Sequence, residues 1–333
     1  MPATLPAYDD LPVRNGLRSA WEVWGDGDDV LGCLNLLTPE RAAEAAGLVE
    51  RGDVFALNWS MGLPDPPLFA REPFVHHVNG RPGGTSQDDV LDNWNTQSSS
   101  QWDGFRHICH LGVAPDHPGT GHFGGVDNDR HGIDHWARRG IVGRGVLADV
   151  GRWRHQQGRP IAYDESDVVT PDELLACLAD QGTEVREGDI LLVRFGWTGW
   201  YERQDADKRQ VLADPMQFRS VGLHPGEETA RALWNLHIAA IGCDNPAVEV
   251  WPPGALLTPD EVAEVRADPS RIHELFVHTI LLPMLGLPLG EMFALDALAD
   301  DCALDGRYEF MVTSAPLNLP RGVASPPNAL AIK

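Results

Sequence analysis

The sequence predicts an α/β fold, a single large domain in which a mixed β-sheet or barrel-like core is flanked by helices. Two observations carry this prediction: short apolar runs follow glycine turns, as buried strands do, and amphipathic segments with capping residues lie between them. Strands that alternate with helices along a chain are typical of α/β proteins. Of 333 residues, 43% are hydrophobic and 23% charged, so the chain can bury a sizeable core.

Helices are expected where a threonine and a proline precede an amphipathic run. Thr38 caps one expected helix over residues 39–49, and Thr170 caps a second over 171–182. A third helix, at 228–236, leads directly into an apolar strand.

The expected strands are short, apolar and mostly preceded by glycine. They lie in VFALNW (54–59), GRGVLADVGRW (143–153), GDILLVRFGWTGWY (188–201), HIAAIGCDN (237–245) and twice in the closing segment 308–332. The apolar segment 273–293 contains Pro283 and Pro288, so it is expected to form a strand, a bend and a turn that carries Glu291.

The expected organisation is an N-terminal arm over residues 1–20 and one domain over 21–333, with loop insertions at 62–92 and 111–135. The first insertion is rich in Pro, Gly and His between Gly62 and Gly84, as is typical of a long surface excursion. Such excursions often cover functional sites.

The charge of the chain excludes two classes of partner. Lys and Arg total 26 against 49 Asp and Glu, which gives a net charge of −23 and a field that repels nucleic acid and anionic membranes. No signal-peptide-like start and no apolar run of about 18 residues occurs, so a cytoplasmic location is expected. The five cysteines lack a CxxC spacing and indicate neither a disulfide framework nor a zinc knuckle.

The densest group of chemically active side chains lies in NTQSSSQWDGFRHICH, residues 95–110. A strand would place Gln97, Gln101, Asp103 and His107 on one face, because their separations are even. Asp103 suits a cation or a base, His107 suits proton transfer, and the amides offer oxygen and N–H groups. The same residue types also suit a polar network that only lines a strand.

Other candidates have a simpler structural explanation. The histidines of the two insertions are expected to be exposed loop residues: His76, His77, His117, His122 and His131. Asp244, Asn245 and Glu249 end a predicted strand, which is a favourable site position in an open α/β sheet, although turn residues of these types are equally common there.

The spacing of Gln97, Gln101, Asp103 and His107 resembles the HxGTHxDxxxH motif of the cyclase superfamily of metal-dependent hydrolases, which includes bacterial kynurenine formamidase and isatin hydrolase. Asp103 and His107 match the motif, whereas Gln97 and Gln101 replace its first two histidines. In this family, those histidines and the aspartate bind a divalent metal, and the last histidine assists proton transfer. The resemblance therefore implies that Asp103 and His107 are catalytic.

Further segments carry the same resemblance. His278 and Glu291 resemble the downstream His and Glu that complete the family's metal centre, and PLNLPRGVASPPNALAI resembles its closing block. With DDVLGCLNLLTPE, RGVLADV, GDILLVRFGW and IGCDNPAVE, the resemblance covers about Trp21 to Ile332. It implies a swivelling β/β/α fold, a homodimer, and a metal site formed by Asp103, His278, Glu291, Gln97 and Gln101. Four neighbours are expected to bind substrate: Trp102, Phe105, Arg106 and His110.

The expected cofactor is a divalent metal, Mn, Zn or Mg. An amide oxygen is a harder and weaker donor than an imidazole nitrogen, so three interpretations remain. The residues form a weaker Mn or Mg site, or His107 and the amides act without metal, or catalysis is lost and a small-molecule-binding protein remains. The expected reaction is hydrolysis of an amide or lactone bond in a small molecule, with His107 as proton shuttle. A cyclase, dehydratase or isomerase acting on a natural-product intermediate is the alternative.

Overall fold

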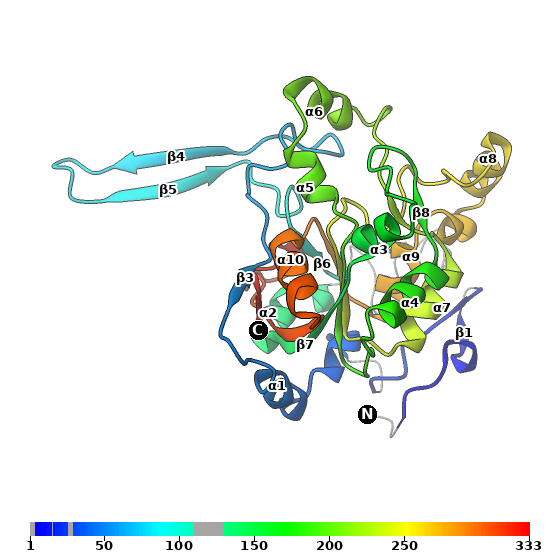
Figure 1. Cartoon of the computed structure of the whole chain (residues 1–333). Coiled ribbons are helices and arrows are strands. Elements are labelled where there is room, and N and C mark those ends of the chain that lie inside the picture. The colour runs from blue at the N-terminus through cyan, green and yellow to red at the C-terminus, as the bar shows by residue number, and fades with distance from the viewer. Residues whose placement is uncertain (1–3, 15, 26–28, 110–128) are drawn as a thin grey trace.

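A curled mixed β-sheet forms the centre of the molecule (Figure 1). The structure is a computed structural model that describes residues 4–14, 16–25, 29–109 and 129–333. Among these residues, nine strands follow one another across the sheet in the order β14 (Ala324–Ser325), β6 (Gln101–Asp103), β12 (Leu289–Glu291), β11 (Ala240–Cys243), β9 (Ile190–Val193), β7 (Ile141–Ala148), β13 (Glu309–Ser314), β15 (Ala329–Ile332) and β3 (Val54–Ala56).

The sheet has a parallel centre and antiparallel flanks. Strands β12, β11, β9 and β7 are parallel, whereas β6 and β14 on one side and β13, β15 and β3 on the other pair antiparallel. All four residues of β9 and of β11 are buried. This two-sided burial explains their unbroken apolar sequences, ILLV and AIGC. The predicted α/β class and mixed sheet are confirmed.

Helices surround this sheet (Figure 1). Helix α1 packs against β7 and β13, and α4 packs against β7 and α7. The α-helices of the described chain are α1 (Pro39–Ala46), α2 (Asp134–Arg139), α3 (Val150–Gln156), α4 (Pro171–Asp180), α5 (Trp197–Glu202), α6 (Ala206–Ala213), α7 (Glu227–Asn235), α8 (Pro259–Ala267), α9 (His278–Ile280) and α10 (Asp296–Asp305). Short 3-10 turns lie at Tyr8–Asp10, Gly32–Leu36, Asp129–His131 and Pro269–Glu274, and a π-helical turn lies at Leu281–Leu285.

The predicted helix caps are present. The Thr38 hydroxyl accepts a hydrogen bond from the Arg41 main-chain N–H, and Thr170 forms a capping box with Glu173. No helix in the described ranges is long and apolar enough to cross a membrane.

The first insertion contains a two-stranded hairpin that projects away from the rest of the molecule (Figure 1). Strand β4 (Val75–Gly80) pairs antiparallel with β5 (Gln87–Asp92), and every residue of both strands is exposed. Two smaller pairs, β1 (Val13–Arg14) with β2 (Leu17–Arg18) and β8 (Val168–Val169) with β10 (Gly222–Leu223), complete the strands. Of the second expected insertion, residues 111–128 lie outside the described residues.

Two predicted strands are wrong in whole or in part. The segment expected to open with a strand forms α9 and the π-helical turn, and Glu291 ends strand β12 instead of lying in a turn. Residues 278–285 are buried on all sides, so they show no helical periodicity that would distinguish them from a strand. In the 95–110 cluster, only Gln101–Asp103 form a strand.

The central strands should dominate stability. Leu192 in β9 has no exposed surface, so Leu192→Ala is expected to lower the free energy of unfolding by about 2–5 kcal/mol through lost burial and a cavity. Leu304 in α10 is 87% exposed, and Leu304→Ala is the matched control, with an expected change within about 0.5 kcal/mol. Urea unfolding followed by circular dichroism would measure both, and equal losses would contradict this assignment of the core.

Candidate functional site

The pairing of β6 with β12 brings together two segments that are far apart in the sequence. The register places Gln101 opposite Glu291 and Asp103 opposite Leu289. Alternate residues of a strand share a face, so Gln101, Asp103 and Glu291 all point to the same side of the sheet. Glu291 also ends one of the parallel strands, at the edge where open α/β sheets carry their sites.

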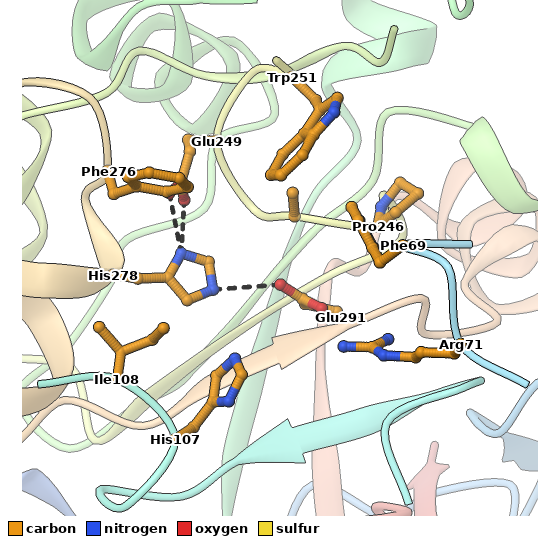
Figure 2. Close-up of a pocket in the computed structure, with 11 residues that line it drawn as sticks. Phe69, Arg71, His107, Ile108, Pro246, Glu249, Trp251, Phe276, His278 and Glu291 are labelled. Atoms are coloured by element: carbon orange, nitrogen blue, oxygen red, sulfur yellow. Dashed lines mark hydrogen bonds and ion pairs between the residues drawn. The ribbon is translucent and has the colours of Figure 1, made fainter. Parts of the chain in front are cut away.

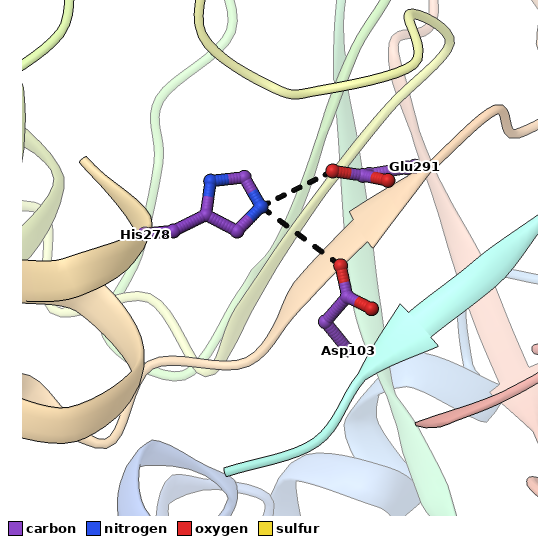
Figure 3. A group of neighbouring side chains, drawn as sticks. All are labelled: Asp103, His278 and Glu291. Carbon is purple, nitrogen blue, oxygen red and sulfur yellow. Dashed lines mark hydrogen bonds and ion pairs between the residues drawn. The ribbon is translucent and has the colours of Figure 1, made fainter. Parts of the chain in front are cut away.

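His278 joins this group from the first turn of α9 (Figure 3). Its Nε2 lies 3.1 Å from Glu291 Oε1 and 3.9 Å from Asp103 Oδ2. Its Nδ1 lies 2.7 and 2.9 Å from the two carboxylate oxygens of Glu249. Burial disfavours a charged imidazole, but Glu249 and Glu291 outweigh it and raise the pKa of His278 well above its ordinary value.

Asp103, His278 and Glu291 have the composition and spacing of a metal site. One ligand atom from each lies within 4.8 Å of the others, and all three residues are buried. Burial, together with the neighbouring Asp103 carboxylate, raises the pKa of Glu291 to about 7. A hydrogen bond from Nδ1–H to a carboxylate, as His278 makes to Glu249, is also the usual way in which a protein orients a metal-binding imidazole.

The two glutamines contact the carboxylates of this group. Gln101 Nε2 donates to Glu291 Oε2 at 2.6 Å and lies 3.2 and 3.3 Å from the oxygens of Asp103. Gln97 Nε2 donates to Asp103 Oδ1 at 2.8 Å. Within the described residues, the buried Gln101 Oε1 has no hydrogen-bond partner. Amide oxygen and nitrogen have nearly the same shape, so a half-turn of the Gln101 amide would present this oxygen to a cation.

The unpartnered Gln101 oxygen indicates that the residues present are suited to bind a metal. Without a cation, the amide can satisfy the carboxylates only by leaving its oxygen buried and unpaired, which is unfavourable. Two carboxylates, one imidazole and an available amide oxygen form a donor set that fits a hard divalent cation.

His107 lies beside this group, outside any strand. Its Nδ1 is 3.0 Å from Gln97 Nε2, and its Nε2 is 3.9 Å from Asp103 Oδ1. Burial lowers the pKa of His107, although the Asp103 carboxylate opposes the shift. The imidazole is therefore neutral at pH 7 and able to exchange a proton.

A cavity of about 190 Å³ opens over His107, His278 and Glu291 (Figure 2). Its walls are mostly apolar and come from four separate segments of the chain. They are formed by Phe69, Ile108, Pro246, Ala247, Trp251 and Phe276, with the charged Arg71 at one side. Ring centroids of Phe69 and Trp251 lie 5.0 Å apart, and those of Trp251 and Phe276 lie 6.3 Å apart.

Among the expected substrate-binding residues, Trp102, Phe105 and Arg106 do not line this cavity. Trp102 and Phe105 are fully buried in the hydrophobic core, where Trp102 packs against Phe293 and Phe105 against Trp136. Trp102 alternates with Gln101 and Asp103 along β6, so it points to the opposite face of the sheet. The Arg106 guanidinium donates to the main-chain oxygen of Arg321, and His110 lies outside the described residues.

Of the three candidates after β11, only Glu249 lies at the cavity. Asp244 accepts hydrogen bonds from the main-chain N–H groups of Phe195, Gly196 and Trp197, so it organises the start of α5. The Asn245 amide donates to two main-chain oxygens.

Sequence reasoning missed the cavity walls. Phe69 and Arg71 lie in the proline-rich excursion, which was expected to cover a site without naming its residues. Trp251 and Phe276 had no motif that would distinguish them from core aromatics.

A family model described as "Putative cyclase" matches residues 40–250, more than half of the chain. The chain belongs to the cyclase family. The resemblance stated from the motifs is thereby confirmed, and the matched range includes Gln97, Gln101, Asp103, His107 and Glu249. That Gln97 and Gln101 occupy metal-ligand positions stays a prediction.

Solved structures agree with this cyclase-family assignment. A crystal structure described as a novel cyclase is 30% identical, covers 95% of this chain and 99% of its own, and has a TM-score of 0.73. Isatin hydrolase A from Labrenzia aggregata is 18% identical, with coverage of 86% and 94% and a TM-score of 0.56. Isatin hydrolase A from Ralstonia solanacearum is 15% identical, with coverage of 90% and 97% and a TM-score of 0.57. These two share the fold. No curated protein sequence matches the chain.

In this cyclase-family chain, the Gln101 amide should stabilise the carboxylates in the absence of metal. Gln101→Leu removes the donor to Glu291 and Asp103 and is expected to lower the free energy of unfolding in EDTA by about 1–3 kcal/mol. Gln156→Leu, at an exposed position of α3, is the control and should change little. Urea titration would measure both, and unchanged stability of Gln101→Leu would show that these hydrogen bonds contribute nothing.

Proposed function

We propose that this protein is a divalent-metal-dependent hydrolase that acts on an amide or lactone bond of a small molecule. The observation that carries the proposal is the buried group of Asp103, His278 and Glu291, with the unpartnered Gln101 oxygen beside it, at the floor of an apolar cavity. Two proteins of the same fold are hydrolases by name, which supports the same class of reaction.

Asp103, His278 and Glu291 would hold the cation, with amide oxygen from Gln101 or Gln97. A cation bound there polarises a carbonyl and lowers the pKa of water. Because oxygen donors predominate, the set favours Mn or Mg over a tight Zn site. Glu249 acts through His278: its carboxylate accepts the Nδ1–H and leaves Nε2 directed at the other two ligands.

His107 is suited to move a proton at the leaving atom. Both ring nitrogens of the neutral His107 lie near the Gln97 amide nitrogen, Nδ1 at 3.0 Å and Nε2 at 3.3 Å. The neutral imidazole can accept the proton that the attacking water loses, and the imidazolium so formed can deliver that proton to a leaving nitrogen or oxygen at the cavity floor. The apolar walls exclude water from the bond being broken and favour substrates with an apolar ring.

The metal can be measured before any substrate is known. Protein purified without a tag or chelator is expected to contain about one Mn, Zn or Mg ion per chain by ICP-MS, and Asp103→Asn and His278→Ala should lose it. Asp89→Asn and His77→Ala, on the exposed hairpin, are matched controls that should keep it. No metal in the wild-type protein, even after incubation with Mn or Zn, would refute the metal-dependent proposal.

His107 should be needed for turnover and not for metal. In a screen of amides and lactones, His107→Ala is expected to lower kcat by about 10²-fold or more while the metal content stays unchanged. His155→Ala, exposed at the end of α3, is the control. Full turnover by His107→Ala would remove this role. Mass spectrometry of the product distinguishes hydrolysis, which adds water, from cyclisation or isomerisation, which does not.

We also propose that the chain works as a homodimer in the cytoplasm. The exposed β4–β5 hairpin carries Val75, Val78, Val90 and Leu91 at its surface, and such apolar side chains are suited to contact with a second chain.

A further inference from the structure

The cavity combines an apolar wall, an acidic floor and one permanent positive charge. Phe69, Trp251 and Phe276 lie on the wall, and Glu249 and Glu291 on the floor. Arg71 is the only lysine or arginine among the described residues that line it. In a chain with a net charge of −23, a guanidinium at this position needs an explanation.

The known contacts of Arg71 leave most of its donors unused. Its Nη1 donates to the main-chain oxygen of Gln97, and its Cζ lies 5.2 Å from the centroid of the Phe69 ring. Within the part of the chain that the structure describes, no carboxylate forms an ion pair with Arg71. A guanidinium has five N–H groups in a planar fork, so donors remain for a further acceptor.

Figure 2 shows the Arg71 side chain reaching toward the cavity from the side of Phe69, next to Glu291. Arg71 is half-buried against the Phe69 ring, and the nearby Glu291 carboxylate is already engaged by His278 and Gln101. The remaining N–H groups of the guanidinium are therefore available to an acceptor on a bound molecule.

We propose that Arg71 binds the carboxylate of a substrate whose apolar, planar ring fills the cavity. This deepens the proposed function by naming the class of substrate: a ring acid with its own carboxylate, apart from the bond to be hydrolysed. A cavity of roughly 150 Å³ is large enough for benzene, and this one measures about 190 Å³, so a single substituted ring fits.

The charge arrangement also fixes the orientation of such a substrate. The carboxylate is repelled by Glu249 and Glu291 and attracted by Arg71, where a paired N–H to oxygen contact is strong and directional. The ring then lies against Phe69 and Trp251, which line the same cavity as Arg71.

The test compares two ligands of equal shape, benzoate and benzamide, by isothermal titration calorimetry. EDTA is present so that benzoate cannot bind through a metal. Wild-type protein is expected to bind benzoate about tenfold or more tightly than benzamide. Arg71→Met keeps an apolar side chain and removes the charge, so the two ligands should then bind with similar affinity. Arg159→Met is the matched control, because Arg159 also packs over an aromatic ring, Trp153, but is exposed and outside the cavity.

Three results would overturn the proposal: no preference for benzoate in the wild-type protein, an unchanged preference in Arg71→Met, or an equal loss of both ligands in that variant. The last result would mean that Arg71 only holds Gln97 in place. If Arg71→Met does not fold, Arg71→Lys takes its place and should retain a reduced preference, because a single ammonium cannot form the paired contact. Because no turnover is measured, a preference for benzoate without any hydrolysis in the amide and lactone screen would refute the proposed function and leave the binding site standing.

Discussion

Three buried carboxylates surround one imidazole, which leaves an excess of negative charge at the site. The protonation of the site and its suitability for a metal both depend on this excess. Asp103, Glu249 and Glu291 are all almost without exposed surface, and His278 can carry only a single positive charge among them. Unpaired charge in the interior of a protein is strongly unfavourable, so the group requires a proton, a cation or both. Burial, together with the neighbouring Asp103 carboxylate, raises the pKa of Glu291 to about 7, which favours uptake of a proton. A divalent cation would balance the group more completely, which is why we favour a metal-dependent function.

Gln101 is suited to this group both without a metal and with one bound. Its position opposite Glu291 in the β6–β12 ladder holds the amide against the carboxylates whatever its orientation. With N–H directed at Glu291 and Asp103 it stabilises the metal-free site, and with its oxygen turned inward it would add a neutral hard donor to the site. A histidine would offer nitrogen, a softer donor. If Gln101 occupies the predicted ligand position, glutamine there fits a change of metal preference as well as it fits a loss of affinity.

The sequence predicted the floor of the site better than its walls. The even spacing of Gln101 and Asp103 correctly placed them on one face of a strand. Gln97 and His107 reach the same region from turns, where an even separation in the sequence does not put two side chains on the same side. The resemblance to the cyclase family singled out His278, although the segment around it is helical and not the expected strand. A segment that is apolar on every side has no periodicity to read. The α/β class was predictable because its central strands are unbroken apolar runs between capped helices.

The walls could not be predicted because they are assembled from loops with no local pattern. Phe69 and Arg71 precede the hairpin, Trp251 follows β11, and Phe276 precedes α9, so their meeting depends on the complete fold. The expectation that Trp102 binds substrate was wrong. Neighbouring residues of a strand point to opposite faces of the sheet, so Trp102, which is next to Asp103, points into the core.

This division between floor and walls has a functional consequence. Gln101, Asp103 and Glu291 of the floor stand on strands β6 and β12, each of which is hydrogen-bonded to a neighbouring strand on both sides. The walls stand on loops that can change in sequence without disturbing these strands. The wall residues that select the substrate can therefore change while the reacting groups of the floor stay the same. Arg71 connects the two parts, because it donates to the main-chain oxygen of Gln97, whose amide donates to Asp103. Recognition of the substrate by Arg71 is thereby coupled to the position of the reacting groups.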